Sequence, residues 1–567
     1  MSSMNSTLAQ GLAVLTLASF LALGPADAKA QGGAPEAHRD RFGGVTRRVG
    51  QPSDSFKVAK VGSRWVFVTP EGNPFLMLGV FFVDVGGSVD DLKDTHANRI
   101  VVKYGSKPKW AEYAVKRLKV WGFNTLAEYS AEYVLPTTSQ YGHVNAEKMP
   151  YVTMIRPAYY GLTNQWNAAP GPVKDLIAGT DPGSYPGWRG NATPDVFDPN
   201  FEIYATAMAG GSSPDASKSP WLIGIATDDA DNIVGFGPGP ELPAPRIHPH
   251  IAWLVLVTNF QQSTNDRLRV KYPDTKVYAK YAFRDFLKAK YDNIAGLNAA
   301  WGARYTSWDS DGGWPSGKGF LDESGRGGWV GKDSDRLTRA TPGVRADLDA
   351  FLYEFAKRYF TATAGAIRKK MPGKLVFGPA TLNGWGGLTR KEILRAAGES
   401  VDVLQAGVTP QLLELTTRYA GDVPIVTWTG VGANPDSSLW RYPNPEGWPK
   451  TQEERAKVYN STLSRDFNVT TTSAGVKHVV GTKFWAWIDS WGEKSNFGLV
   501  SFLDNAYDGK EAVRARGKDQ WGFPVGGEEK DYGDFITTVR RTNLELMRQL
   551  SDDLARSSSA TRQPERR

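Results

Sequence analysis

Residues 75–83 read FLMLGVFFV, a continuously apolar run in a chain of 567 residues. A strand that is buried on both faces of a parallel sheet has no polar face, so it lacks the alternation of a half-exposed strand. The run follows a predicted hairpin, whose strands are residues 58–61 and 65–69, and the turn-rich PEGNP of residues 70–74. We therefore predict that residues 75–83 form the first strand of a parallel sheet.

Seven further short apolar runs occur later in the chain, each followed by a loop and a helical stretch. They are residues 123–126, 151–155, 221–226, 374–377, 401–405, 424–428 and 483–488. Eight such strands in this order indicate a closed (β/α)8 barrel. A doubly wound open sheet is the alternative, but no Gly-rich phosphate loop follows any of the strands.

Helical patterns place an insertion in the barrel. We expect a helix at residues 110–121, after the first strand, and three more at 250–260, 278–290 and about 344–370. The last three all fall between the fourth and fifth strands. The expected fold is therefore an α/β (β/α)8 TIM barrel with a short N-terminal β-hairpin and a long helical insertion between strands four and five.

The first thirty residues are typical of a secretory signal peptide. Residues 11–23 form an apolar run too short to span a bilayer, and a small-x-small cleavage site, AKA, follows at residues 28–30. No later segment approaches 18 uninterrupted apolar residues. We expect a secreted or periplasmic protein without membrane contact after signal cleavage, divided into four parts. These are a signal peptide (1–30), a flexible linker (31–55), the barrel domain (56–550) and a disordered tail (551–567).

Composition excludes several kinds of chemistry. The chain has no Cys, which excludes Cys nucleophiles and thiolate metal sites. Its net charge is +7, but Lys and Arg are scattered, which favours a solvated surface over a nucleic-acid partner. The 19 Trp suit either sugar-binding platforms or the core of a large barrel. No G-x-S-x-G elbow supports an esterase, and we expect neither a cofactor nor a metal.

Functional residues of such a barrel lie where the strands end. Those positions hold Asp84, Glu128, Arg156, Asp228, Asp229, Asp231, Asn383, Trp385, Trp428, Asp489 and Trp491. Carboxylates and Trp suit glycoside hydrolysis, which needs one carboxylic acid to protonate the leaving oxygen and one carboxylate as nucleophile or base.

The three Asp after strand four, at positions 228, 229 and 231, are open to three interpretations. Mutual repulsion would raise the pKa of one of them, as a general acid requires. Asp at a strand end also commonly caps the following helix. A Ca²⁺ site is the third reading, although the EF-hand pattern is absent.

Several motifs resemble those of the clan-A glycoside hydrolases, in particular the family-50 β-agarases and family-42 β-galactosidases. They are WVFVTPEGNPF (65–75), WGFNTL (121–126), PDVFDP (194–199), LNAAWG to Trp308 (297–308), and residues 481–489 with NFGLV (496–500). Together they span roughly residues 65–508. The resemblance implies a barrel acting on agarose-like or β-galactoside sugars.

The resemblance also implies an acid/base Glu after strand four and a nucleophilic Glu at the end of strand seven. The matching positions here hold Ala230 and Trp428. A shift of one residue would make Asp229 the acid, whereas no shift supplies an acid at the end of strand seven.

Two functional hypotheses follow, both with a poly- or oligosaccharide as the partner. The first is a secreted glycoside hydrolase with non-standard carboxylates, in which Asp229 is the general acid and Asp489, Glu128 or Asp228 supplies the base or nucleophile. The second is a catalytically inactive glycan-binding protein on the same barrel. Under either hypothesis, the candidate substrate-binding residues are Trp385, Trp428, Trp485, Trp487, Trp491, Asn383 and Asn124. A lyase has no positive feature in its favour, and no oligomeric state follows from the sequence.

Overall fold

The computed structural model describes most of the chain from His38 onward, all of it within one unit, residues 38–567. The described residues are 38–85, 100–101, 103–137, 145–179, 193–211, 215–229, 233, 235–236, 249–260, 263–265, 268–313, 316–324, 340–379, 389–430, 449–471, 475–489, 496–501, 504–509, 512–513, 530–531 and 533–560. The expected signal peptide lies outside them.

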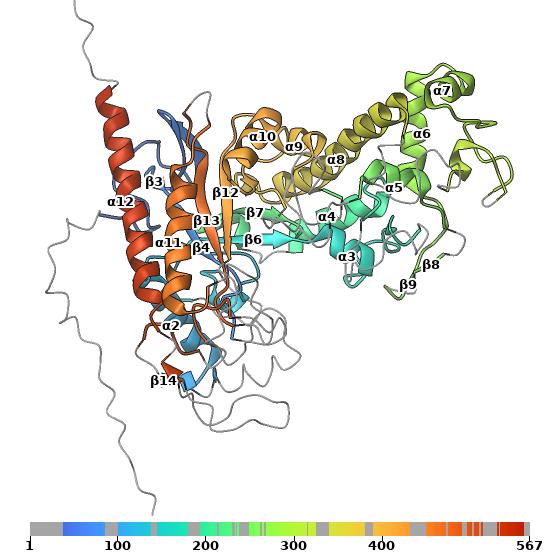
Figure 1. Ribbon diagram of the computed structural model, residues 1–567. Coiled ribbons are helices and arrows are strands. Elements are labelled where there is room, and N and C mark those ends of the chain that lie inside the picture. The colour runs from blue at the N-terminus through green and yellow to red at the C-terminus, as the bar shows by residue number, and fades with distance from the viewer. Residues whose placement is uncertain are drawn as a thin grey trace, which may run out of the picture. The chain divides into compact units, whose positions relative to one another are not determined.

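Eight parallel strands form the central sheet (Figure 1). In chain order they are β4 (Met77–Val80), β5 (Thr125–Leu126), β6 (Tyr151–Ile155), β7 (Leu222–Thr227), β10 (Leu375–Val376), β11 (Leu404–Gln405), β12 (Ile425–Gly430) and β13 (Val479–Trp485). Each pairs with its neighbours in sequence, in the order β10-β7-β6-β5-β4-β13-β12-β11. The two end strands also meet, because Phe377 bridges Val403 in parallel and Gly378 N donates to Val403 O at 3.0 Å. The predicted (β/α)8 barrel is confirmed.

Helices surround the barrel. They are α2 (Lys107–Val120), α3 (Pro157–Thr163), α4 (Pro199–Gly211), α9 (Lys391–Gly398), α10 (Pro410–Ala420), α11 (Gln452–Asn468) and α12 (Ile536–Ala560), with short 3-10 turns η1 (Glu132–Val134) and η3 (Ala216–Lys218). Several of these helices begin at an N-cap residue that the sequence provides. Ser106 caps α2 by accepting from Lys109 N, and Thr451 caps α11 by accepting from Glu454 N. Helices α11 and α12 lie side by side (Figure 1), and α11 packs against β12 and β13.

The insertion between the fourth and fifth strands is confirmed. It contains α5 (Ile251–Val257), β8 (Thr264–Asn265), β9 (Val270–Lys271), α6 (Tyr278–Lys290), α7 (Ile294–Trp301), η5 (Phe320–Asp322) and α8 (Pro342–Lys370). Helix α8 has 29 residues and contacts α5, α6 and α7 as well as α4, α9 and strands β7 and β10. Helix α8 therefore connects the insertion to the barrel.

The N-terminal hairpin closes the amino-terminal end of the barrel. It is formed by β1 (Lys57–Val61) and β2 (Arg64–Val68), and β3 (Pro74–Phe75) pairs back onto β2. The apolar run 75–83 is thereby divided, because Phe75 belongs to this small sheet and only Met77–Val80 belongs to the barrel. Phe67 of β2 stacks on Phe377 inside the barrel, with ring centroids 6.0 Å apart.

Part of the expected linker packs against this end. Phe42 is buried and its ring lies 4.6 Å from that of Trp221. Asp40 fixes the segment by accepting hydrogen bonds from Phe42 N, at 2.9 Å, and from the Thr69 hydroxyl, at 2.6 Å. Asp40 and Phe42 thus pack against the barrel, while the flexibility of the rest of the expected linker stays a prediction.

The last described residues of the chain are helical. Residues 551–560, assigned to a disordered tail, continue helix α12. Leu554 is buried, and Asp553 accepts a hydrogen bond from Arg64 Nε at 3.0 Å. A small antiparallel pair, β14 (Ala512–Val513) and β15 (Lys530–Asp531), precedes this helix.

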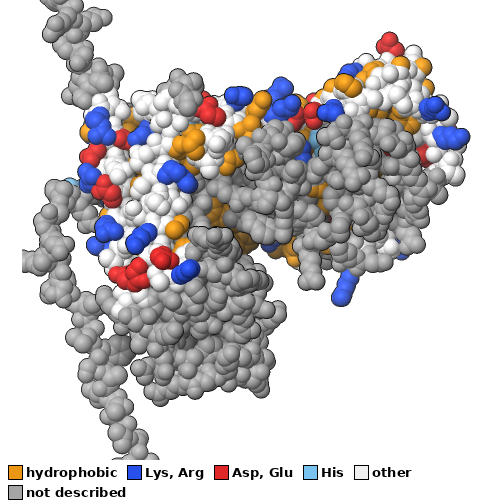
Figure 2. Space-filling model, viewed as in Figure 1, with side chains coloured by type: hydrophobic (Ala, Val, Ile, Leu, Met, Phe, Trp, Pro, Cys, Tyr) orange, Lys and Arg blue, Asp and Glu red, His pale blue; other side chains and the backbone are white. Residues whose placement is uncertain are grey.

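The described surface carries both signs of charge. On the face drawn in Figure 2, Lys and Arg side chains are interspersed with Asp and Glu, so the visible described surface has no uniform basic stripe. None of the described helices combines the length and the apolar character that crossing a membrane requires.

Candidate functional site

Aromatic side chains gather at the carboxyl ends of β4, β5, β12 and β13. The ring centroid of Phe81 lies 4.9 Å from that of Trp428 and 5.6 Å from that of Trp485. The two Trp rings are 5.1 Å apart, and both side chains are half-buried. Together with Phe82 and Tyr129 these residues form what we call the mouth cluster. It places Trp428 and Trp485, two of the predicted sugar-binding residues, side by side.

Tyr129 connects the mouth cluster to the end of strand four. Its hydroxyl donates to Asp229 Oδ2 at 2.6 Å, and its ring stacks on Phe82 with centroids 4.5 Å apart. Phe82 and Tyr129 both have positive φ, 53° and 64°, a strained conformation for such residues that is concentrated at functional sites. Burial and the nearby charge of Asp229 raise the pKa of Tyr129 well above its ordinary value, so this hydroxyl keeps its proton.

A cation lies at the same side of the barrel. Arg156 precedes helix α3 and places its guanidinium carbon 5.5 Å from the ring centroid of Tyr129 and 4.4 Å from that of Tyr159. Cation–π contacts of this kind orient a guanidinium without using its hydrogen-bond donors. The positive charge of Arg156 acts on the pKa of Tyr129 in the lowering direction, against the larger effects of burial and Asp229.

A buried ion pair lies below the mouth cluster, inside the barrel. Lys483 of β13 donates from Nζ to Glu128 Oε1, and to Gln405 Oε1 of β11 at 2.7 Å. Both members of the ion pair are almost completely shielded from solvent. Burial lowers the pKa of Lys483, and the charge of Glu128 opposes this. Gly79 of β4 lies beside the lysine, where a Cβ would be in van der Waals contact with Lys483 Cγ at 3.4 Å.

Asp228 is directed away from the mouth, towards the helices. It is buried, has a φ of 52°, and accepts hydrogen bonds from Ala158 N at 2.9 Å and from the Tyr359 hydroxyl of α8 at 2.8 Å. Burial raises the pKa of Asp228 to about 7, although these hydrogen bonds oppose the rise. Both carboxylate oxygens are thus used to join the first turn of α3 to α8. Its predicted catalytic role stays a prediction.

The carboxylate of Asp489 is likewise engaged in hydrogen bonds within the fold. Its oxygens accept from Asn496 Nδ2 at 2.9 and 3.0 Å, from Gly498 N at 2.8 Å and from the Tyr507 hydroxyl. Burial raises the pKa of Asp489 to about 6, against the Tyr507 hydrogen bond and the charge of Arg455. These contacts hold the chain segment that follows β13, and a catalytic role for this carboxylate also stays a prediction.

Two predicted sugar-binding residues lie in the packed interior. Trp487 is fully buried, with its ring stacked on that of Trp121 at 5.8 Å and edge-on to that of Trp110 at 6.1 Å. Asn124 lies between strands, where its Oδ1 accepts from Leu78 N at 2.8 Å and its Nδ2 donates to Leu76 O at 2.8 Å. The positions Asn383, Trp385 and Trp491, as well as Ala230 and Asp231, lie outside the described residues.

The structure therefore brings together Asp229, Trp428 and Trp485, with Glu128 adjacent in sequence to Tyr129. Sequence reasoning did not select Tyr129, Phe81, Gln405 or Lys483. A signal existed for Lys483, which is the one charged residue in the strand VVGTKFW. Within the described part of the chain, no group of three or more His, Cys, Asp or Glu is arranged to hold a metal ion.

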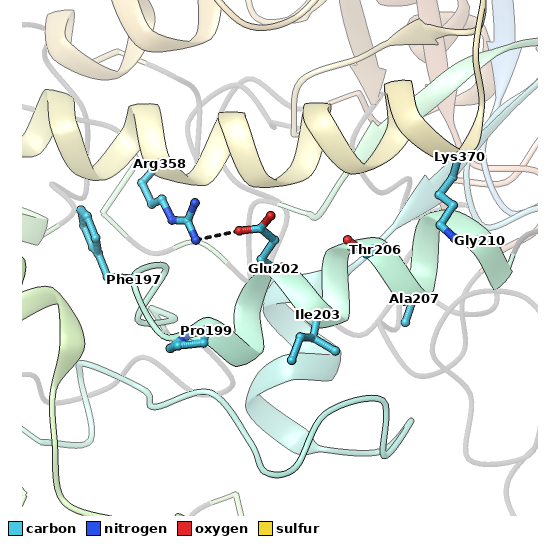
Figure 3. A pocket seen from close by; sticks show the side chains of 9 residues that line it. All are labelled: Phe197, Pro199, Glu202, Ile203, Thr206, Ala207, Gly210, Arg358 and Lys370. Atoms are coloured by element: carbon cyan, nitrogen blue, oxygen red, sulfur yellow. Dashed lines mark hydrogen bonds and ion pairs between the residues drawn. The ribbon is translucent and has the colours of Figure 1, made fainter.

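A separate groove of about 820 Å³ lies between α4 and α8 (Figure 3). Glu202 of α4 and Arg358 of α8 form an ion pair across it at 2.9 Å, and Lys370 lies at its other end beside Gly210. None of the predicted site residues lines this groove, so we place the candidate site at the barrel mouth.

The chain is similar in sequence to two β-agarases. The chain is 25% identical over 439 residues to β-agarase A of Vibrio sp. (strain JT0107), and 24% identical over 422 residues to β-agarase B of the same organism. These matches cover 73% and 71% of this chain but only 36% of each relative. The chain thus spans about a third of the length of the curated relatives it matches. No protein-family model matches the sequence.

Solved structures show the same fold. An exo-β-agarase superposes with a TM-score of 0.62 at 19% identity, covering 90% of this chain and 67% of that protein. A second agarase superposes with a TM-score of 0.60 at 18% identity, covering 90% of this chain and 68% of that protein. The resemblance to β-agarases noted in the sequence is therefore supported over most of the barrel.

Proposed function

We propose that this protein acts on an agarose-like or β-galactoside polysaccharide as a glycoside hydrolase with non-standard carboxylates. Asp229 is the general acid, and Glu128 supplies the second carboxylate. The similarity to β-agarases supports the substrate class, and the arrangement at the barrel mouth supports the choice of residues.

The observation that carries the proposal is the hydrogen bond from Tyr129 to Asp229. It joins the ends of strands two and four at the mouth cluster, and Glu128 immediately precedes Tyr129. Of the four candidate carboxylates, Asp228 and Asp489 have both oxygens engaged by donors of the fold, whereas Asp229 is half-buried at the mouth. A general acid must reach the leaving oxygen, so accessibility favours Asp229 over Asp228 and Asp489. Glu128 is shielded together with Lys483, so its role as second carboxylate requires that the bound sugar reach the base of the mouth.

The experiment is to incubate the purified protein with agarose and with a panel of neutral and acidic polysaccharides, and to measure released reducing ends. Asp229→Asn and Glu128→Gln should each lower the rate by about 100-fold or more, because acid–base catalysis contributes about 10²–10⁴-fold. Asp285→Asn, at an exposed carboxylate of α6 paired with Arg284, is the matched control and should leave the rate unchanged. Cleavage that survives both site substitutions would refute the assignment.

A second candidate function is glycan binding without hydrolysis. Trp428 occupies the end of strand seven and packs against Phe81 and Trp485, so an aromatic ring fills the place where the resemblance to the agarases implies a nucleophilic Glu. Aromatic faces of this kind stack on sugar rings. Retention on a polysaccharide without release of reducing ends would favour this candidate over the first.

Export is part of the proposal. The predicted signal peptide at residues 1–30 would deliver the protein to the periplasm or medium, where a polysaccharide is accessible. Fusion of residues 1–30 to a reporter, followed by assay of the reporter outside the cytoplasm, tests this directly. A reporter that stays in the cytoplasm would contradict it.

A further inference from the structure

We propose that Lys483 is a positioning residue of the sugar site. It fixes the Glu128 carboxylate through one oxygen and leaves the other oxygen to accept a hydrogen bond from a sugar hydroxyl. The inference rests on the proposed function only in taking a glycan as the ligand, and it holds whether or not the glycan is cleaved.

The first observation is how Lys483 is held. Its Nζ contacts Glu128 Oε1 and Gln405 Oε1, which come from the ends of strands two and six. Nζ also lies 5.7 Å from the ring centroid of Phe81 and 5.1 Å from that of Phe377. The ammonium group is therefore enclosed on several sides, and the Glu128 carboxylate that it holds has a defined orientation.

The second observation is an unpartnered oxygen. Glu128 Oε2 is buried, and it has no hydrogen-bond partner among the described residues. The Nε1 donor of Trp428, in the mouth cluster, is also buried without a partner in this part of the chain. Leaving a buried charged acceptor unsatisfied costs free energy, so a hydroxyl donor that reaches it is bound strongly.

The third observation concerns what the ion pair does for the fold. Replacing a buried ion pair by apolar residues of similar volume is often neutral or stabilising, so stability alone does not explain the pair. Its member Glu128 and the neighbouring Gln405 lie at the carboxyl ends of strands, where barrels place ligand-binding residues. Among the described residues, Tyr129 experiences the charges of Asp229, Arg156 and Glu128, so these groups lie on the same side of the mouth.

The experiment measures affinity for agarose by affinity electrophoresis and by calorimetry with soluble agarose oligosaccharides. The central variant is the double substitution Glu128→Gln with Lys483→Met, which removes both charges together and so avoids leaving one of them buried alone. The matched control is Arg64→Met with Asp553→Asn, which removes another shielded ion pair, at 3.0 Å, between β2 and α12. Thermal unfolding and circular dichroism establish that each variant is folded.

We expect the folded Glu128/Lys483 double variant to bind agarose about 10- to 100-fold more weakly than the wild type, as for loss of a hydrogen bond to a charged group. The Arg64/Asp553 control should bind like the wild type. Lys483→Arg, which keeps a cation, should retain more affinity than Lys483→Met. Glu128→Gln alone should also weaken binding, and this result decides the matter if the double variant does not fold.

Three outcomes separate this inference from the proposed function. Wild-type affinity in the folded double variant, or in Glu128→Gln where the double variant is unfolded, overturns the inference and leaves the function standing. If the variant binds agarose more weakly and the wild type binds it without releasing reducing ends, the inference is supported and the hydrolase function is refuted. If the wild type binds neither agarose nor any polysaccharide of the panel, both the inference and the proposed function are refuted.

Discussion

Asp228→Asn should change how the stability of this protein depends on pH. The carboxylate is buried and accepts from Ala158 N and the Tyr359 hydroxyl. Asn has the same shape and tolerates the φ of 52° found at this position. Its amide oxygen can still accept from Ala158 N, while its amide nitrogen can donate to the oxygen of Tyr359. The substitution therefore removes the titrating group and keeps the local contacts.

The size of the effect follows from the pKa of this one group. Burial raises the pKa of Asp228 from 3.8 to about 7. In the folded protein the group therefore holds its proton at pH values where the unfolded chain has released it. The free energy of unfolding of the wild type should fall as the pH rises from about 3.8 to about 7, and level off above. At about 1.4 kcal/mol for each tenfold change in proton affinity, the fall is about 4 kcal/mol.

The measurement is urea unfolding of the wild type and Asp228→Asn at pH 4.5, about 6 and about 8. The free energy of unfolding of the variant should rise relative to that of the wild type as the pH rises, because the variant has no carboxylate charge to bury. Burial also raises the pKa of Asp195 to about 7 and that of Asp489 to about 6, but both groups are present in both proteins and cancel in the difference. A stability difference that does not change with pH would refute the reasoning.

Three further predictions concern the barrel and its mouth. Tyr129→Phe removes the hydrogen-bond donor to Asp229 and should lower kcat/KM or glycan affinity, measured with agarose, by about 10-fold. Unaltered thermal stability of the variant would exclude a folding defect. Trp428→Ala should weaken agarose binding by about 10-fold or more, whether or not the protein cleaves it; unchanged retention in affinity electrophoresis would count against the mouth cluster as the sugar site. Gly224→Ala places a Cβ 2.3 Å from the backbone oxygen of Leu375 and 2.6 Å from the Phe377 ring. It should lower the free energy of unfolding by about 1–3 kcal/mol in urea titrations, and wild-type stability would contradict this.

Much of the fold could be predicted because strand and helix periodicity is local. The segment YVTMI matches β6, and the helix expected at 278–290 matches α6. The predicted strand boundaries were less accurate where pairing between strands overrides the local preference of the sequence. The run 75–83 is a single apolar stretch in sequence, yet Pro74–Phe75 pairs antiparallel with β2, so only part of it enters the barrel.

The candidate site was predictable only in outline. Topology alone places Glu128, Asp229 and Trp428 at the same end of a barrel, because parallel strands end together. It does not say which way each side chain faces. Asp228 and Asp229 are neighbours in sequence, but one bonds to the helices and the other to Tyr129 at the mouth. Trp485 and Trp487 are separated in the same way, between the mouth cluster and the packed interior.

The sequence by itself determined the eight-stranded barrel and its insertion, because apolar runs and motifs are properties of short segments. Only the tertiary structure decided which polar groups meet. Lys483 and Glu128 are 355 positions apart, and the energy of their contact depends on a closed barrel that excludes water around them. No local pattern encodes that pairing, because it exists only once strands two, six and eight have closed around the same axis.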